Sequence, residues 1–364
     1  MWWLQIIDQK RTGLYVQPMV RTILVIAGNS VDYALGENII KLPFLHALRR
    51  WFHDTHISWG PGLGEPLMLG ALAPLFAGHV SEVIRDLSMP KTMVAALNQG
   101  AILPGRHFDL VIDTQSHPGC TLQARRIGHQ RFIARTWHWW FSDGRPPPGQ
   151  SRSPRLVHRL LELLSAATGC VVEAPYDPLP LPAEWHERAA ALLLSGPVYI
   201  GLAPGAGNKV RGKCWRLDGY IAVAQQQAAQ GRVPVFILGP VEAEWEAFLR
   251  VEVPSALFPD LSAGPALTVA LGQRLAAAVA NCSGTGHMLA SGGCPMVSLF
   301  GPTDPKKYAP WSHRVVAIRA ADFGNRAIDS IPVPIVIEAV EHILRPEWTG
   351  PAERLLGPPG LRPL

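Results

Sequence analysis

The residues best suited to bind phosphate form one run in the last third of the chain. A short apolar stretch, 275–280, precedes the run and a second, 296–300, follows it. Between them stand, in order, Ser283, Gly284, Thr285, Gly286 and His287. This order predicts a strand, a glycine-rich turn, a helix with a histidine in its first turn, and another strand. Such a turn presents backbone N–H groups to an anion at a helix start.

A second candidate phosphate site follows the apolar stretch 198–203. Gly205 and Ala206 end this predicted strand. Three cations come next, at Lys209, Arg211 and Lys213, and each could neutralise phosphate oxygens. A solvated basic loop is the simpler interpretation of the cations when they are taken alone.

Two carboxylates follow glycines at predicted strand–helix junctions. Glu37 follows Gly36 at a helix start, where it could act as a general base or only cap the helix. Glu242 lies just beyond Gly239 and could bind ribose hydroxyls or only begin a helix. Spacing alone favours the structural role for each.

Taken in order, these motifs resemble glycosyltransferase family 9, which contains the ADP-heptose:lipopolysaccharide heptosyltransferases. The run 281–287 resembles the family's Asn-Asp-Ser-Gly-x-x-His, and 300–305 resembles its Phe-Gly-x-Thr-x-Pro. The segment 213–215 resembles Lys-x-Trp, and the strand that ends before Gln115 resembles one that ends in Asp-x-Gln. The chain departs from the family at Cys282 and at Glu37, where the family has aspartates. The resemblance spans Thr22 to Trp311.

Alternating strand and helix patterns predict two α/β domains, and Pro175–Pro182, with four prolines, predicts a linker. The resemblance implies a GT-B type α/β fold, with two facing Rossmann-like domains and a cleft between them. The expected divisions are an acceptor-side domain at 1–174, a linker at 175–183, a nucleotide-sugar-binding domain at 184–333, and a tail at 334–364 that packs back on the protein.

The resemblance also implies roles for individual residues. It assigns catalysis to Glu37 as base, with Lys213 and His287. It assigns the acceptor side to Gly36 and Gln115. The residues expected to bind the nucleotide-sugar are Gly205, Ala206, Lys213, Gly239, Glu242, Cys282, Ser283, Gly284, Thr285, Gly286 and His287. Lys209 and Arg211 compete with Lys213 for the diphosphate, and no metal ligand is expected.

The leading hypothesis is an inverting, metal-independent glycosyltransferase that needs no cofactor. Its donor would be a nucleotide-diphospho-sugar of the ADP-heptose type, and its acceptor a surface glycan or glycolipid such as lipopolysaccharide core. The alternative is a degenerate member that binds nucleotide or glycan without turnover. A nucleotide-sugar epimerase stays open, whereas a nicotinamide oxidoreductase lacks the third glycine of its motif after Gly205. A nucleophilic role for Cys282 fits the run less well than phosphate binding does.

Composition limits the protein class. The chain has 364 residues, 48% of them hydrophobic and 17% charged, which is enough for two cores. A net charge of +5 and the lack of nucleic-acid motifs favour anionic small ligands or a membrane surface over nucleic acid.

Five cysteines without CxxC spacing and the lack of a signal peptide predict a cytoplasmic protein, peripheral at most on the inner face of the membrane. The aromatic stretch Trp137–Phe141 is either core or a lipid-facing surface, with core packing favoured, and the last residues are expected to fray.

Overall fold

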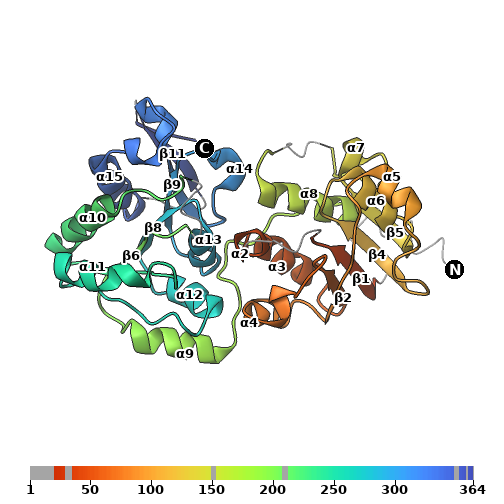
Figure 1. The fold of residues 1–364 in the computed structure, drawn as a ribbon, viewed down its shortest axis with the longest axis horizontal. Helices are drawn as coiled ribbons and strands as arrows, with labels where there is room; N and C mark the ends of the chain where they lie inside the picture. Colours follow the sequence, from red (N-terminus) through yellow and green to blue (C-terminus); the bar gives the residue numbers. More distant parts are fainter. Residues whose placement is uncertain are drawn as a thin grey trace.

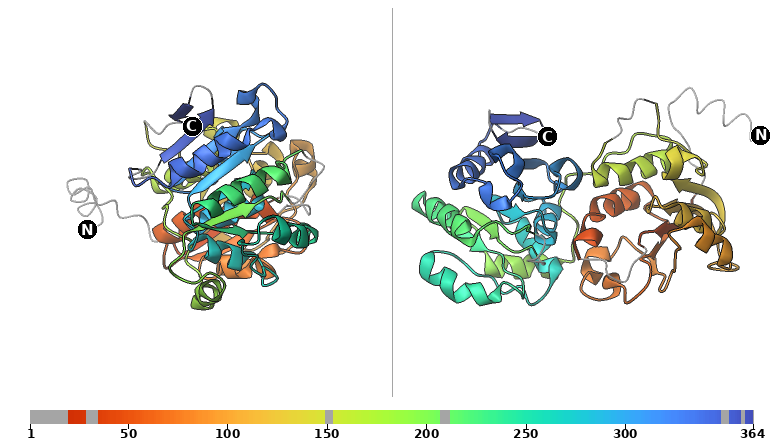
Figure 2. Two further views of the ribbon diagram at one scale, coloured as in Figure 1. Left: turned by 90° about the vertical axis from the view of Figure 1, so that its left-hand side faces the viewer. Right: turned by 45° about the horizontal axis from the view of Figure 1, so that its top comes forward.

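The structure is a computed structural model that describes residues 20–28, 35–148, 153–206, 212–347, 352–357 and 360–363. The chain folds into two α/β domains, each built on a largely parallel sheet with helices packed against it. The domains stand side by side as two lobes in Figure 1 and in the right-hand view of Figure 2. The α/β, GT-B type fold expected from the sequence is therefore confirmed.

The first domain holds a five-stranded parallel sheet in the order β3-β2-β1-β4-β5. Its strands are β1 (Thr22–Ile26), β2 (His56–Gly60), β3 (Glu82–Val83), β4 (His107–Asp113) and β5 (Gly128–Ala134). The central strand β1 is buried along nearly its whole length, as its unbroken apolar run requires. In a parallel sheet all the carboxyl ends lie at one edge, so the loops after β1, β4 and β5 are neighbours.

Helices of the first domain are α2 (Leu35–Ile39), α3 (Leu42–Trp51), α4 (Ala73–Phe76), α5 (Met93–Asn98), α6 (Pro118–Ala124), α7 (Thr136–Trp139) and α8 (Leu156–Thr168). The sequence predicts one helix from Glu37 to Phe52, but the structure divides it between Ile39 and Leu42. Pro43 causes the break, because it has no N–H and its ring conflicts with the carbonyl four residues earlier. The break leaves α2 as a short helix that carries Gly36 and Glu37.

The second domain holds a seven-stranded sheet in the order β12-β11-β10-β9-β8-β6-β7. Its strands are β6 (Tyr199–Ala203), β7 (Val233–Phe236), β8 (Ala277–Asn281), β9 (Met296–Phe300), β10 (Arg314–Arg319), β11 (Ala352–Gly357) and β12 (Gly360–Pro363). All pairs are parallel except β11 with β12. The expectation that the last residues fray is wrong for these two strands, because β11 pairs with β10 from Arg314 to Ile318 and β12 pairs with β11.

Helices of the second domain are α9 (Ala183–Leu192), α10 (Leu217–Ala229), α11 (Glu246–Glu252), α12 (Pro265–Gly272), α13 (Gly284–Ser291), α14 (Pro305–Tyr308) and α15 (Val333–Ile343). Helix α15 buries Val336, Ala339, Val340 and Ile343 against this domain's own core. The expected tail is thus built into the second domain. No helix of the described residues is long and apolar enough to cross a membrane.

One apolar cluster runs through both domains without a break. It contains Ile23 and Phe44 of the first domain, Leu179 of the connecting segment, and Leu267 and Met296 of the second, each at most 3% exposed. The domains therefore share a core as well as a connecting chain.

Trp311 fastens the connecting segment to the second domain. Its ring stacks on Tyr176 at 4.6 Å between centroids, and its Nε1 donates to the Pro175 carbonyl at 3.2 Å. From the first domain, Arg155 places its guanidinium 5.3 Å from the same ring and donates to the carbonyls of Ala309 and Pro310. Trp311 is thus a joint contact of both domains and the segment between them.

The aromatic stretch after β5 differs from expectation. Trp139 is buried, but Trp137 is 47% and Trp140 is 79% exposed. The expectation of core packing is wrong for these two, because the backbone turns left-handed at Trp137 and His138 and directs the chain along the surface.

Helices α12 and α13 approach each other so closely that only glycine fits between them. A Cβ on Gly292 would lie 2.1 Å from the carbonyl oxygen of Val269, which is backbone and cannot rotate away. We predict that Gly292→Ala lowers the free energy of unfolding by about 1–3 kcal/mol, as overpacking does. Chemical denaturation measures this, with Gly100→Ala as the control, since a Cβ there meets nothing within 4 Å. Equal stabilities of the two variants would contradict the prediction.

Candidate active site

The glycine-rich turn forms as the sequence predicts, between β8 and α13. Ser283 is the N-cap of α13, and its Oγ accepts a hydrogen bond from the Gly286 N–H at 3.4 Å. A Cβ on Gly286 would lie 3.2 Å from that of Ala280, so the helix start packs tightly on the strand. The turn therefore has little freedom, and it presents the helix N-terminus at the carboxyl end of the sheet.

Asn281, the last residue of β8, fixes this turn to the loop after β6. Its side chain is fully buried, and its Nδ2 donates to the Pro204 carbonyl at 2.6 Å. Its Oδ1 accepts from the Trp215 N–H at 3.0 Å. One amide thus connects three segments of the candidate site.

His287 lies among cations from both domains. Burial lowers its pKa to about 4, and the charges of Arg155 and Lys213 act in the same direction. Arg155 precedes α8 of the first domain, and Lys213 follows β6 of the second. The imidazole is therefore neutral at pH 7, and two positive charges stand near it, an arrangement suited to a bound anion.

Cys282 is partly buried beside the same lysine. Burial raises the pKa of its thiol, and Thr303 and Lys213 oppose that shift without reversing it. The thiol is therefore protonated at pH 7, which makes it a poor nucleophile. The Thr303 hydroxyl is buried beside this thiol.

Glu242 lies where strands β6 and β7 end. It is only 5% exposed. Cβ atoms placed on Gly205 and Gly239 would lie 2.5 Å and 2.7 Å from its carboxylate oxygens, so both glycines leave room for it. The carboxylate therefore sits where two adjacent parallel strands end, and a cis-diol there would find an acceptor.

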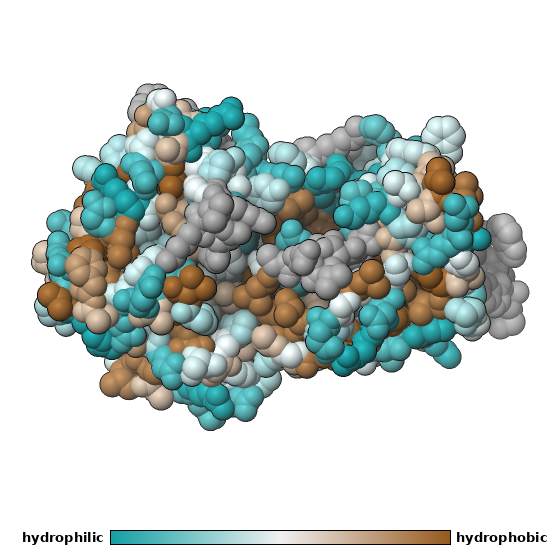
Figure 3. All heavy atoms as spheres, in the orientation of Figure 1, coloured by the Kyte–Doolittle hydropathy of each residue, from teal (hydrophilic) through white to brown (hydrophobic). Residues whose placement is uncertain are grey.

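The two domains meet at a pair of glycines. A Cβ on Gly36 of α2 would lie 3.4 Å from the Cα of Gly284 in α13, and the reverse distance is also 3.4 Å. Two helix starts, one from each domain, therefore approach with backbone against backbone. The carboxyl ends of the two sheets face each other here, and the molecular outline is notched between the lobes (Figure 3).

Glu37 and Gln115 occupy the first-domain side of this contact. Glu37 is exposed in the first turn of α2. One turn later, Lys41 donates to the Ala27 carbonyl, and burial lowers the pKa of its ammonium to about 8 against the attraction of Glu37. Gln115 donates to the same carbonyl from Nε2 at 2.9 Å. Gln115, Lys41 and Glu37 thus group at the end of β1.

The structure gathers the sequence-predicted residues into three neighbouring groups. Asn281 links the turn that contains Cys282, Ser283, Gly284, Thr285, Gly286 and His287 to the loop that contains Gly205 and Ala206. The Gly36–Gly284 contact links that turn to the acceptor side. The competing cations Lys209 and Arg211 lie outside the described residues. Among the residues described, no group of three or more His, Cys, Asp or Glu side chains is arranged to hold a metal ion.

Four residues of this region have no role that the sequence predicts: Lys41, Arg155, Asn281 and Thr303. Asn281 had a local signal, because a polar side chain directly ends an apolar strand. Arg155 had none, since it lies in the other domain and more than a hundred residues from His287 in the chain.

Two facing α/β domains with a glycine-rich turn at their contact define a GT-B type glycosyltransferase architecture. The family model described as glycosyltransferase family 9 (heptosyltransferase) matches residues 100–329. The chain belongs to this family. No curated protein sequence matches it.

Solved structures of the same architecture cover nearly the whole chain. A family 9 glycosyl transferase from Veillonella parvula is 19% identical, with a TM-score of 0.65 over 90% of this chain and 98% of its own. E. coli ADP-heptose lps heptosyltransferase II is 17% identical, with a TM-score of 0.60 over 89% and 98%. E. coli heptosyltransferase WaaC with ADP is 16% identical, with a TM-score of 0.62 over 88% and 99%. At these identities the likeness establishes the fold.

The lowered pKa of His287 makes stability depend on pH. In the unfolded chain histidine binds its proton near pH 6.5, but the folded protein resists protonation until about pH 4. Stability is therefore lost as pH falls through this window. We predict that His287→Gln removes about 1–2 kcal/mol of the loss between pH 7 and pH 5.

Urea denaturation at the two pH values measures this dependence. His53→Gln, at an imidazole that is 79% exposed, is the control. An unchanged pH dependence in His287→Gln would refute the prediction.

Proposed function

We propose that the protein is an inverting glycosyltransferase that moves a sugar from a nucleotide-diphospho-sugar to a glycan acceptor. The observation that supports this most strongly is the contact between Gly36 and Gly284. It sets the helix start that carries Glu37 against the helix start that carries the glycine-rich turn. A base from one domain and an anion site from the other thus lie on either side of the Gly36–Gly284 contact.

In the proposed reaction Glu37 removes the proton of an acceptor hydroxyl. The oxygen forms a bond to the anomeric carbon while the bond from that carbon to the diphosphate breaks, and the electron pair leaves with the diphosphate. Because Glu37 and the turn lie on opposite domains, attack comes from the side opposite the leaving group, which inverts the anomeric configuration.

The leaving diphosphate gains negative charge, and this chain's cations are arranged to stabilise it. Lys213 lies near both His287 and Cys282, as their pKa shifts indicate. The neutral His287 donates one N–H, and the N-terminus of α13 adds backbone donors. In this proposal these groups take the part that a metal ion has in other nucleotide-sugar enzymes.

Glu242 supports recognition of the nucleotide. Its carboxylate, held between Gly205 and Gly239, is suited to accept hydrogen bonds from the ribose hydroxyls, as acidic residues after the second strand do in dinucleotide-binding folds.

The relatives suggest the donor and acceptor. Heptosyltransferase WaaC has been solved with ADP and with ADP-2-deoxy-2-fluoro heptose. We therefore propose ADP-heptose as the donor type and lipopolysaccharide core as the acceptor class, which would place the reaction at the inner face of the cytoplasmic membrane.

Release of nucleotide from ADP-heptose, UDP-sugars and GDP-sugars, with and without a lipid-A-core extract, tests the reaction. We predict that Glu37→Gln lowers acceptor-dependent release about 10²–10⁴-fold, because the base is lost, while ADP affinity is kept. Glu184→Gln is the matched control, an exposed glutamate in the first turn of another helix, α9. Release from every donor at the same rate in Glu37→Gln and wild type would refute this role.

Lys213 is tested by nucleotide binding. We predict that Lys213→Ala weakens ADP binding at least tenfold, because a charge-assisted contact to phosphate is lost. Adenosine, which has no phosphate, should lose no affinity. Calorimetry measures the affinity for each ligand. Equal losses of affinity for ADP and for adenosine would contradict a contact between Lys213 and phosphate.

Cys282 supports a second candidate function, a family member that binds its ligands without turnover. A protonated thiol is a weak hydrogen-bond acceptor where the family has a carboxylate. If nucleotide binds but no donor is turned over, Cys282→Asp should restore release. Turnover by the wild type excludes this candidate.

A further inference from the structure

Lys41 is a half-buried residue whose ammonium group is withdrawn from water. It stands in the break between α2 and α3, one helical turn after Glu37. The break directs its side chain back to the first sheet, where Nζ donates to the Ala27 carbonyl just beyond the end of β1. Moving an ammonium out of water costs free energy, so such a group is commonly retained for its charge.

The Ala27 carbonyl is a fixed point that Lys41 shares with Gln115. Gln115 Nε2 donates to this carbonyl at 2.9 Å, and the Ala27 N–H donates to the Gly60 carbonyl of β2 at 2.8 Å. Because the sheet holds Ala27 in place, the lysine that binds it holds the end of α2. The carbonyl also keeps a donor when Lys41 is replaced, since Gln115 still reaches it.

Glu37 and Lys41 attract each other without forming an ion pair. Burial lowers the pKa of Lys41 to about 8, and the charge of Glu37 opposes that shift. Within the described residues no ion pair includes the Glu37 carboxylate, which is exposed on α2. A carboxylate bonded to an ammonium would have to give up that bond before it took a proton from an acceptor. Lys41 supplies positive charge from a distance and leaves the carboxylate oxygens open.

The same short helix makes the contact between the domains. Gly36 of α2 approaches Gly284 of α13, so a displacement of α2 would move Glu37 relative to the Ser283–Gly286 turn. Lys41 holds the other end of this helix on the sheet. One side chain thus fixes the place of the carboxylate and adds a positive charge beside it.

The carboxylate at the end of β4 has partners of its own. Asp113 accepts from the Thr121 hydroxyl at 2.6 Å and from the Gln115 N–H at 2.8 Å, and the Thr121 hydroxyl lies 2.6 Å from that of Thr136. Burial raises the pKa of the Asp113 carboxyl. These hydrogen bonds direct Asp113 into the first domain and away from α2.

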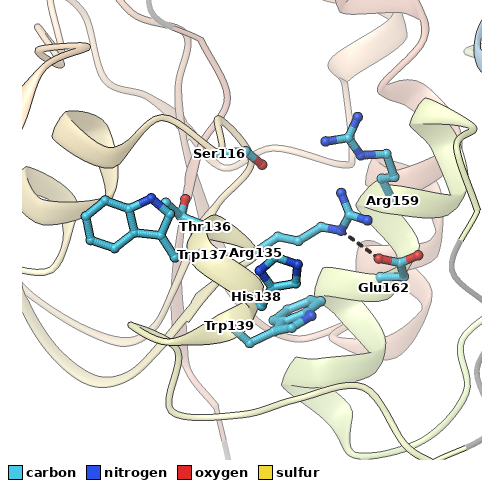
Figure 4. Close-up of a pocket in the computed structure, with 8 residues that line it drawn as sticks. All are labelled: Ser116, Arg135, Thr136, Trp137, His138, Trp139, Arg159 and Glu162. Carbon is cyan, nitrogen blue, oxygen red and sulfur yellow. Dashed lines mark hydrogen bonds and ion pairs between the residues drawn. The ribbon is translucent and has the colours of Figure 1, made fainter.

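The charges beyond β5 are also paired among themselves. In a cavity of about 290 Å³ there, Glu162 accepts from Arg135 Nε at 2.8 Å, and Arg159 of the same helix α8 stands close to this pair (Figure 4). Among the described residues, the charge that acts on the pKa of Lys41 is that of Glu37.

An acceptor sugar bound over Glu37 would remove its carboxylate from water. Loss of water disfavours the charged form, and a neutral carboxyl cannot take a proton from a hydroxyl. A cation one helical turn away opposes this effect.

We propose that Lys41 is a positioning residue for Glu37, which anchors the end of α2 to β1 and keeps the carboxylate ionised when the acceptor covers it. The proposal rests on the glycosyltransferase function above and deepens it, because it makes the base a pair of groups. Lys41 itself contacts neither the acceptor nor the donor.

Nuclear magnetic resonance of the full-length protein with 13C-labelled lysine measures the coupling without turnover. One lysine Cε resonance, absent in Lys41→Met, should titrate near pH 8. In Glu37→Gln this resonance should titrate at lower pH, because the charge that raises the pKa of Lys41 is lost. Glu184→Gln, at an exposed glutamate of α9, is the control and should leave the titration unchanged. The same Lys41 titration in Glu37→Gln and wild type would overturn the proposal.

The pH dependence of turnover separates positioning from structural support. With saturating acceptor, kcat of the wild type should fall about tenfold as pH rises through about 8, because Lys41 loses its charge. Lys41→Met should have the low rate already at pH 7 and no fall up to pH 9, whereas Lys41→Arg should keep its rate to pH 9. His287, with a pKa of about 4, and the Cys282 thiol, whose pKa burial raises, do not titrate near pH 8.

The fold should survive the Lys41→Met change. It replaces an ammonium withdrawn from water by an apolar side chain of similar length, and Gln115 still binds the Ala27 carbonyl, so the melting temperature should stay near that of the wild type. Lys91→Met, at an exposed lysine of the same domain, is the matched control and should keep the wild-type pH profile. A lower rate in Lys41→Met with the wild-type pH profile would show structural support alone and overturn the proposal.

The two measurements also separate this proposal from the transferase. Turnover with the same rate and pH profile in wild type and Lys41→Met would remove the role of Lys41 and leave the transferase. A Lys41 titration that depends on Glu37, without turnover of any donor, would retain the coupling of the two side chains and remove the transferase.

Discussion

The contact between Gly36 and Gly284 is the constraint on which the candidate site depends. Two backbones from different domains approach until a Cβ on either glycine would lie 3.4 Å from the other's Cα. At that distance a Cβ would make ordinary van der Waals contact, so the two helix starts, and with them Glu37 and the Ser283–Gly286 turn, lie close together. The break that Pro43 imposes between α2 and α3 makes this approach feasible, because a short α2 can take its own direction. The contact between these helix starts and the break at Pro43 therefore set the geometry of the site.

Both domains contribute positive charge to the region around the glycine-rich turn. The second domain offers Lys213, a neutral imidazole and a protonated thiol, and the first adds Arg155 from across the interface. The replacement of an expected aspartate by Cys282 removes a negative charge from this group. The Glu242 carboxylate is held at the other end of this side, between β6 and β7. Positive charge thus concentrates at the turn where the proposed reaction puts the diphosphate, and Glu242 lies where the proposal puts the ribose hydroxyls.

How far the sequence predicts this structure differs between its parts. Apolar runs such as Thr22–Ile26 and Met296–Phe300 identify buried strands, and small residues after them identify the turns, because both signals are local. The signals fail where the outcome depends on distant residues. Arg155 contacts the second domain because it precedes helix α8, which lies at the boundary between the domains. No residue near Arg155 in the sequence indicates this contact. Trp137 is exposed because a buried Asp113–Thr121–Thr136 chain holds its backbone left-handed. The sequence does not indicate strands β11 and β12, because the pairing of β11 with β10 and of β12 with β11 outweighs a local composition rich in proline and glycine.

The apolar cluster that the two domains share determines how the protein should unfold. Because Ile23, Leu179 and Met296 belong to one continuous set of buried contacts, neither domain can lose its structure without exposing apolar surface of the other. Unfolding should then be a single cooperative event despite the two separate sheets, with equal calorimetric and van't Hoff enthalpies. Either half of the chain expressed alone would present a bare hydrophobic face. We therefore expect a molecule of two domains to unfold as one cooperative unit.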